Sequence, residues 1–133
     1  MKFPYQKEVS ELFGEIFRPI VEFEIETKIG WISVLGYIDS GADVTLLPRS
    51  FISPLGIKVE EEEIKEVRGI GEGKVPIIIK QVKMKLGNKN FDAKVAIALI
   101  EDIPYILGRE DVFDQFKICF DQRKKIVHFE VTR

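Results

Sequence analysis

Cysteine and histidine are almost absent from this sequence. Its 133 residues include one cysteine, Cys119, so an internal disulfide is excluded. The one histidine, His128, could anchor a serine or cysteine triad only with partners that the sequence does not reveal, so a half-buried structural histidine is the simpler interpretation. Cys119 stands between two apolar residues and is expected in the core or on a strand face. Neither residue belongs to a recognisable set of metal ligands, so no metal and no cofactor is predicted.

Long apolar runs and a surplus of basic charge are also missing. No apolar stretch is long enough to span a bilayer, and the N-terminus lacks the apolar block of a secretory signal. The 20 Lys and Arg residues are outnumbered by 22 Asp and Glu residues, and the net charge of -2 argues against a general nucleic-acid binder. We therefore expect a soluble, cytoplasmic protein with neither a membrane nor a nucleic-acid partner.

The apolar residues that are present follow the period of β-strands. Val21, Phe23 and Ile25 alternate with glutamates, so one face of this segment should be buried and the other wet. Residues 31–38 are nearly all apolar, as expected for a strand covered on both faces. Turns rich in Gly and Asn separate further segments of this kind. The expected strands cover residues 21–25, 31–38, 44–47, 64–68, 75–79, 82–86, 91–99, 105–107, 117–120 and 125–131.

Helix is expected to be scarce. Residues 48–53 could form one helical turn, and residues 110–116 could form a short helix in the C-terminal third. We therefore predict one all-β domain over residues 1–133, folded as a barrel or a sandwich. Residues 1–18 are an extension of unclear role, where Gly14 weakens an apolar pattern with helical spacing. That pattern consists of Val9, Leu12, Phe13 and Ile16.

Asp39 is the residue most in need of an explanation. It directly follows the apolar strand expected over residues 31–38, so its carboxylate should be partly buried. An unpaired buried charge is destabilising, which suggests a purpose for this one. However, Asp39, Ser40 and Gly41 are all common turn residues, and taken alone they favour an ordinary turn.

Three segments, in order along the chain, resemble the retropepsin-like aspartic proteases. Residues 37–45, Tyr-Ile-Asp-Ser-Gly-Ala-Asp-Val-Thr, are similar to the family's catalytic loop. Residues 106–109, Ile-Leu-Gly-Arg, are similar to its apolar-apolar-Gly segment, which an Arg and a short helix follow. The Gly-rich hairpin tip at residues 69–73 is similar to its flap. The resemblance extends over about residues 20–116. It implies a closed acid-protease barrel, a single-domain, homodimeric family member of prokaryotic type, and the hydrolysis of peptide bonds.

The chemistry of such an enzyme requires two carboxylates that face each other across one water. Two close carboxylates hold one proton between them, as in aspartic proteases generally, so one acts as a base and the other as an acid. This chain contains Asp-Ser-Gly once, at residues 39–41. The second carboxylate must then be Asp39 of another subunit, related by a two-fold axis.

The resemblance also implies roles for the neighbours of Asp39. Gly41 and Ala42 would allow a tight backbone beside the carboxylate, and the Ser40 hydroxyl would form a hydrogen bond across the dimer. Asp43 and Arg109 would form an ion pair that braces the loop, for which a bidentate geometry is suited. Solvated surface charge is the alternative for these two residues.

A further glycine, Gly108, would pack tightly against the loop. The candidate lid over an extended peptide substrate consists of Gly69, Ile70, Gly71 and Gly73.

The sequence departs from the family pattern in two places. Glu110 follows Arg109 where many members carry Asn or Asp. The C-terminal hairpin at residues 117–131 is longer than in the smallest viral members, so the dimer interface is expected to be built differently at the termini. A second function class remains open: a non-catalytic module with the same fold that dimerises and binds extended peptides by strand addition.

Overall fold

The computed structural model describes residues 1–68 and 73–132. Within this part of the chain, helix is limited to three short 3₁₀ turns, at Arg49–Phe51, Glu61–Glu63 and Phe113–Gln115. None of these is long or apolar enough to cross a membrane. The remaining regular structure is β-strand, so the all-β prediction is confirmed.

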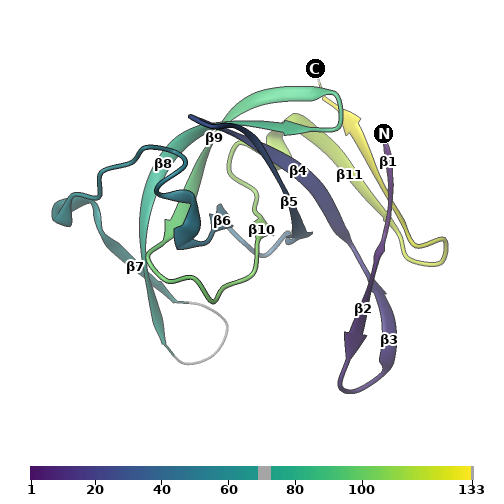
Figure 1. Ribbon diagram of the computed structural model, residues 1–133. Helices are drawn as coiled ribbons and strands as arrows, with labels where there is room; N and C mark the ends of the chain where they lie inside the picture. The colour runs from purple at the N-terminus through teal and green to yellow at the C-terminus, as the bar shows by residue number, and fades with distance from the viewer. Residues whose placement is uncertain (69–72, 133) are drawn as a thin grey trace.

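The strands form a closed barrel, a sheet at the termini and a separate hairpin. The barrel runs in the order β4-β5-β10-β6-β9-β8 and closes where β8 pairs with β4 at Glu24 and Ile25. β7 lies at the outer edge of β8, β1-β12-β11 form the terminal sheet, and β2 pairs with β3 (Figure 1). The strand bounds are β1 Lys2–Pro4, β2 Gln6–Ser10, β3 Gly14–Arg18, β4 Ile20–Thr27, β5 Gly30–Ile38, β6 Thr45–Leu47, β7 Lys65–Arg68, β8 Lys74–Leu86, β9 Lys89–Ala98, β10 Ile106–Leu107, β11 Phe116–Asp121 and β12 Ile126–Val131.

The core of the barrel is made by alternate side chains of its strands. In β4, Val21, Phe23 and Ile25 are buried, whereas the glutamates between them are exposed or half-exposed. Burial of one such side chain stabilises the fold by about 1.5–3 kcal/mol. A shift of the β4 register by one residue would turn all three toward solvent and would therefore be strongly unfavourable. The alternation predicted for this strand is therefore confirmed.

The strand β8 is longer than expected. The sequence indicated two strands, at residues 75–79 and 82–86, but the structure has one strand of 13 residues. The break was wrong because Lys80 and Gln81 stay paired with β9 and no glycine or proline interrupts the ladder there. The turn after β8 is as predicted, with Gly87 at a φ of 61°.

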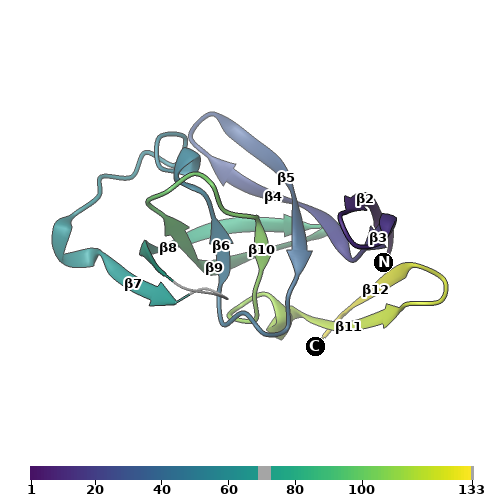
Figure 2. The same cartoon turned by 90° about the horizontal axis from the view of Figure 1, so that it is seen from below.

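The terminal sheet joins the two ends of the chain on one side of the barrel (Figure 2). Phe129 of β12 packs edge-to-face against Phe3 and Phe116, with ring centroids 5.4 and 5.3 Å away. His128, half-buried as predicted, pairs across the ladder with Cys119. Cys119 is exposed on a strand face, so its alternative placement in the core is wrong.

The strand β5 differs from the prediction on one face. Val34 and Ile38 point into the barrel and are buried, but Trp31 and Leu35 are 39% and 51% exposed. The expectation of cover on both faces was therefore wrong for the single chain. The in-plane neighbours β4 and β10 satisfy the backbone of β5 without covering its outer face.

The N-terminal extension contains no helix. Residues 1–18 form β1 and the hairpin β2–β3 instead, so the apolar spacing there was misleading. Gly14 starts β3 at a φ of 70°, which a right-handed helix does not allow. Val9 and Leu12, which would have formed a buried helix face, are exposed.

The helix expected over residues 110–116 is reduced to the 3₁₀ turn Phe113–Gln115. Asp111 has a φ of 61°, and one residue in the left-handed region ends a right-handed helix. Its backbone N–H donates to Asp114 Oδ2 at 3.1 Å instead of continuing a helical ladder. The apolar side of this segment still packs inward, since Val112 and Phe116 are buried.

Candidate active site

Asp39 lies at the C-terminal end of β5, where this strand is held between two neighbours. The backbone N–H of Ile38 donates to the Pro19 carbonyl beside β4 at 3.1 Å. On the other side, the N–H of Asp39 donates to the Leu107 carbonyl of β10 at 3.0 Å. The position of Asp39 is therefore fixed by the barrel, and its side chain is half-buried, as the sequence predicted.

A tight loop follows Asp39. The backbone N–H of Gly41 donates to Asp39 Oδ1 at 2.9 Å, and the N–H of Ala42 donates to the Asp39 carbonyl at 3.2 Å. A Cβ atom on Gly41 would lie 3.2 Å from the same Oδ1, closer than most side chains tolerate. Glycine thus lets the backbone turn around the carboxylate and orient it.

Gly108 crosses directly behind this loop. A Cβ atom at this position would overlap the carbonyl group of Val44 and lie 2.8 Å from the backbone nitrogen of Thr45. The N–H of Gly108 donates to the Thr45 hydroxyl at 3.1 Å, and Thr45 is completely buried. The expected tight packing of Gly108 against the loop is therefore present in the structure.

The Arg109 side chain ties two points of the loop together. Its two terminal nitrogens have different partners: Nη2 lies 2.6 Å from Asp43 Oδ1, and Nη1 donates to the Ser40 carbonyl at 3.2 Å. The pair is thus not the bidentate one that the sequence suggested, because one nitrogen is used for the backbone. The side chains are 53% exposed for Arg109 and 89% for Asp43, so their attraction contributes to geometry more than to stability.

Two backbone hydrogen bonds complete this brace. The N–H of Arg109 donates to the Ala42 carbonyl at 2.9 Å, and the N–H of Glu110 donates to the Asp43 carbonyl at 2.8 Å. The Glu110 side chain contacts Lys94 at 3.4 Å, so the departure from Asn or Asp at this position leaves the backbone brace in place. Residues 106–110 therefore contact the loop along its length, from Asp39 to Asp43.

A second pair of side chains, which the sequence did not reveal, fixes the far end of this segment. Asp111 Oδ2 accepts hydrogen bonds from both the backbone N–H and the ammonium group of Lys94, each at 2.9 Å. The backbone N–H and then the ammonium of Lys94 lower the pKa of Asp111. In return, the hydrogen bond to Asp111 raises the pKa of Lys94. No sequence signal joins the two residues, because they meet only through the left-handed conformation of Asp111.

The candidate flap is described in part. Its strands β7 and β8 pair from Lys65–Ile77 to Arg68–Lys74, so the predicted hairpin is confirmed up to its tip. Gly73 has a φ of 122°, a conformation open mainly to glycine. The other expected lid residues, Gly69, Ile70 and Gly71, lie outside the described residues.

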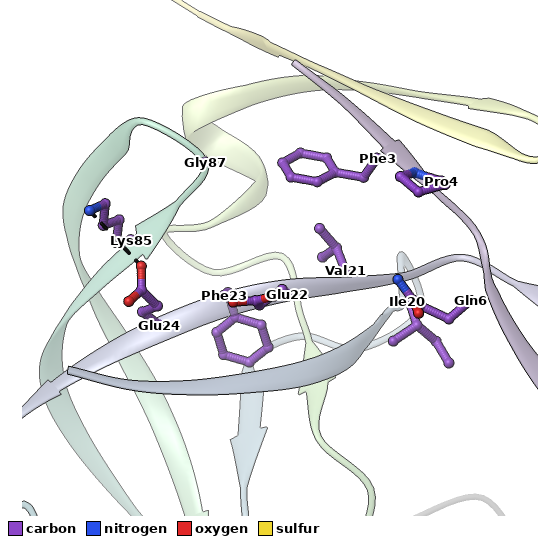
Figure 3. Close-up of a pocket in the computed structure, with 10 residues that line it drawn as sticks. All are labelled: Phe3, Pro4, Gln6, Ile20, Val21, Glu22, Phe23, Glu24, Lys85 and Gly87. Atoms are coloured by element: carbon purple, nitrogen blue, oxygen red, sulfur yellow. Dashed lines mark ion pairs between the residues drawn. The ribbon is translucent and has the colours of Figure 1, made fainter.

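Two hollows on the surface do not contain Asp39. One, of about 340 Å³, lies between β1, β4 and the end of β8 and is lined by Phe3, Val21 and Phe23 among others (Figure 3). The other, of about 430 Å³, is bordered by Asp43 and Arg109. In the described part of the chain, no group of His, Cys, Asp and Glu side chains could hold a metal ion. Geometry around Asp39, rather than the size of a hollow, therefore identifies the candidate site.

The comparison with known proteins agrees with this geometry. A family model described as retroviral aspartyl protease matches residues 17–120, which include the loop at Asp39 and the brace at Arg109. The chain belongs to this family. The predicted resemblance to this family is thus confirmed.

Two named relatives are distant in sequence. The chain is similar to DNA damage-inducible protein 1 of Yarrowia lipolytica, with 27% identity over 70% of this chain and 24% of that protein. It is also similar to the protein of the same name from Candida glabrata, with 24% identity over 92% of this chain and 29% of that protein. The chain thus spans about a quarter of the length of these relatives.

Solved structures support the fold. A retropepsin-like aspartic protease from Rickettsia conorii aligns with a TM-score of 0.60 and 15% identity, over 96% of this chain and 97% of that one. The retroviral protease-like domain of Ddi1 from Leishmania major aligns with a TM-score of 0.58 and 13% identity, over 86% of this chain and 90% of that one. The closed barrel is therefore a retropepsin-like fold.

Proposed function

We propose that this chain is one subunit of a homodimeric aspartic endopeptidase whose active site takes one Asp39 from each subunit. The supporting observation is the state of the Asp39 loop: it is braced from behind by residues 106–110, while Ser40 and Asp43 on its outer side are exposed. A rigid loop with an uncovered outer side suits packing against a second copy. The single Asp-Ser-Gly of the sequence makes that second copy a chemical requirement.

The proposed reaction uses the proton that the two carboxylates share. The ionised Asp39 removes a proton from the water, whose oxygen attacks the carbonyl carbon of the peptide bond. Asp39 of the partner subunit donates its proton to the carbonyl oxygen, which gives a neutral tetrahedral diol. Asp39 then gives the proton it took from the water to the peptide nitrogen, and Asp39 of the partner subunit takes a proton from one hydroxyl of the diol. The C–N bond breaks, a carboxyl and an amino terminus result, and the two carboxyl groups again share one proton. No metal or cofactor takes part in this sequence of steps.

The rest of the site would hold the substrate in an extended conformation. β7 extends below the barrel in Figure 1, and the hairpin tip at residues 69–73 would close over the peptide as a lid. Closure excludes water and orients the scissile bond, which is where much of the rate enhancement of such a site would arise. The exposed Ser40 would form its hydrogen bond to the partner subunit beneath the bound peptide.

The test is hydrolysis of an unfolded protein at mildly acid pH. We expect the wild type to cleave it, a statine-type transition-state analogue to stop cleavage, and Asp39→Asn to abolish cleavage without loss of the fold. The Asn amide keeps the shape of the side chain but cannot act as the base. An Asn variant that cleaves at near the wild-type rate would refute the role of Asp39, and binding without cleavage by the wild type would favour the non-catalytic module.

A further inference from the structure

The β2–β3 hairpin, residues 6–18, is an arm that projects from the barrel (Figure 1). Three apolar side chains at its end face solvent: Val9 is 83% exposed, Leu12 84% and Phe13 76%. Scattered exposed apolar residues need no explanation, but a group of them at the tip of a projecting element marks a contact surface. Another exposed aromatic, Phe17, lies further along β3.

The arm is held in a defined position at its base. The Tyr37 hydroxyl lies within hydrogen-bond distance of both carboxylate oxygens of Glu8, at 2.9 and 3.0 Å. Arg18 Nη1 contacts the same carboxylate at 3.0 Å. Tyr37 stands two residues before Asp39 on β5, so the arm is attached to the strand that carries the candidate catalytic residue.

The tip of the arm is also ordered. The Ser10 hydroxyl accepts hydrogen bonds from the backbone N–H groups of Leu12 and Phe13, at 3.2 and 3.3 Å. A Lys7–Glu15 ion pair joins the two strands at 2.9 Å. The apolar side chains are therefore displayed by a formed turn and not by a disordered end.

The arm and the candidate flap lie on the same side of the barrel. In Figure 1, β7 and the β2–β3 hairpin both extend downward, and β5 runs downward toward the end that carries Asp39. Figure 2 places the arm and β7 toward opposite ends of the molecule with the end of β5 between them, so a chain bound at Asp39 would have to be long to reach the arm. Within the described chain, β2 and β3 pair only with each other, so each keeps one free edge to which an extended segment could add.

The exposed area of the arm tip suits a secondary contact better than a subunit interface. A buried aromatic side chain contributes about 150–250 Å² of contact area, so the tip offers a few hundred Å² in total. A stable dimer interface buries about 1,200–2,000 Å². A small apolar surface becomes effective when its ligand is already held nearby, because the second contact is then intramolecular.

We propose that the β2–β3 arm is a second binding site for the polypeptide substrate, where it takes an extended, apolar segment away from the scissile bond. This role rests on the proposed peptidase function. It gives the enzyme a preference for long, unfolded chains over short peptides, because only a long chain can contact Asp39 and the arm at once.

The test compares the double variant Leu12→Ser/Phe13→Ser with a matched control, Ile29→Ser. Ile29 is 78% exposed in the turn between β4 and β5, so its replacement removes a similar apolar side chain away from the arm. Cleavage of a reduced, alkylated protein and of a short peptide is measured for each, because only the long chain could contact Asp39 and the arm at once. For the double variant we expect KM for the long substrate to rise about tenfold, with kcat and cleavage of the short peptide unchanged.

Binding is measured separately in the Asp39→Asn background, by fluorescence anisotropy of the labelled unfolded protein. Leu12→Ser/Phe13→Ser should raise the Kd for the unfolded protein about tenfold, like KM, and Ile29→Ser should leave this Kd unchanged. An arm effect on binding together with an inactive wild type would refute the peptidase but keep the arm. Unchanged KM and Kd would refute the arm, and so would a shift of the double variant to monomer in sedimentation, because its apolar tip would then belong to a subunit interface.

Discussion

Gly108 leaves no room for a side chain against Val44. Its missing Cβ is the reason that β10 can pass directly behind the loop from Asp39 to Thr45, since that Cβ would overlap the Val44 carbonyl. Both partners at this crossing are backbone, which cannot move aside as the end of a flexible side chain can. The close approach therefore sets how near the brace at Arg109 can come to the loop.

Gly108→Ala should therefore be strongly destabilising. We expect a loss of about 2–4 kcal/mol in the free energy of unfolding, measured by urea denaturation, because the crossing must open. Gly14→Ala is the matched control: its φ of 70° is unfavourable for alanine, but nothing lies near the added Cβ. That variant should lose only about 1 kcal/mol. Gly108 has no positive φ, so a loss as small as that of Gly14→Ala would mean that the crossing relaxes around the added methyl group.

Arg109→Lys should separate activity from stability. Lysine can replace one contact of Arg109 but cannot reach both Asp43 and the Ser40 carbonyl with one ammonium group. Because the ion pair is exposed, we expect a change in stability of less than about 1 kcal/mol. The loop should lose its alignment, and kcat should fall about 10- to 100-fold with little change in KM.

The control for Arg109→Lys is Lys83→Ala, which removes the exposed Lys83–Asp92 ion pair on the β8–β9 hairpin. It should change neither kcat nor the melting temperature appreciably. A normal kcat in Arg109→Lys would show that the Asp39 loop does not need the brace.

Much of this site could be predicted from the sequence because its parts are close in the chain or part of a family motif. Asp39, Gly41 and Asp43 lie within five residues of one another, and the Gly108-Arg109 pair has a recognisable apolar prefix. The contact between Tyr37 and Glu8 could not be predicted. It depends on the register of a hairpin whose apolar spacing resembled a helix.

The outer face of β5 shows a different limit. Trp31 and Leu35 are apolar and exposed in the single chain. An apolar pattern does not tell whether such side chains are covered by the same chain, by another molecule or not at all, so their exposure could not be predicted. Similarly, the pair of Lys94 and Asp111 depends on one left-handed residue, which local composition does not specify.

Stability at low pH should depend on Asp111. Its pKa is lower in the folded protein than its ordinary value of 3.8, so its contribution is present above that value and is lost as the pH falls through the folded pKa. Asp111→Asn removes the charge but keeps a side chain that tolerates the left-handed conformation. The wild type should therefore be the more stable protein at neutral pH, and the difference in melting temperature should shrink below about pH 4. A difference that stays constant down to pH 2 would show that the charge of Asp111 is irrelevant.

The shared site makes a quantitative prediction for mixed dimers. If each active site needs Asp39 from both subunits, a dimer of one wild-type and one Asp39→Asn subunit is inactive. Equal amounts of the two proteins, exchanged fully where dimers dominate, leave about a quarter of the dimers as wild-type pairs, because the assembly is two-fold symmetric. Activity on any cleavable peptide should fall to about that fraction of an all-wild-type sample at the same total concentration.

The control for this mixture is subunit exchange itself, followed by energy transfer between wild-type and Asp39→Asn subunits that carry donor and acceptor dyes on Cys119, the chain's one exposed thiol. A site contained within one chain would leave about half of the activity, because every wild-type subunit would still work whatever its partner. Half of the activity after confirmed exchange would thus exclude the shared site. A fall to about a quarter of the activity would support the shared site, because the wild-type subunit of a mixed dimer would then be inactive for lack of a second Asp39 carboxylate.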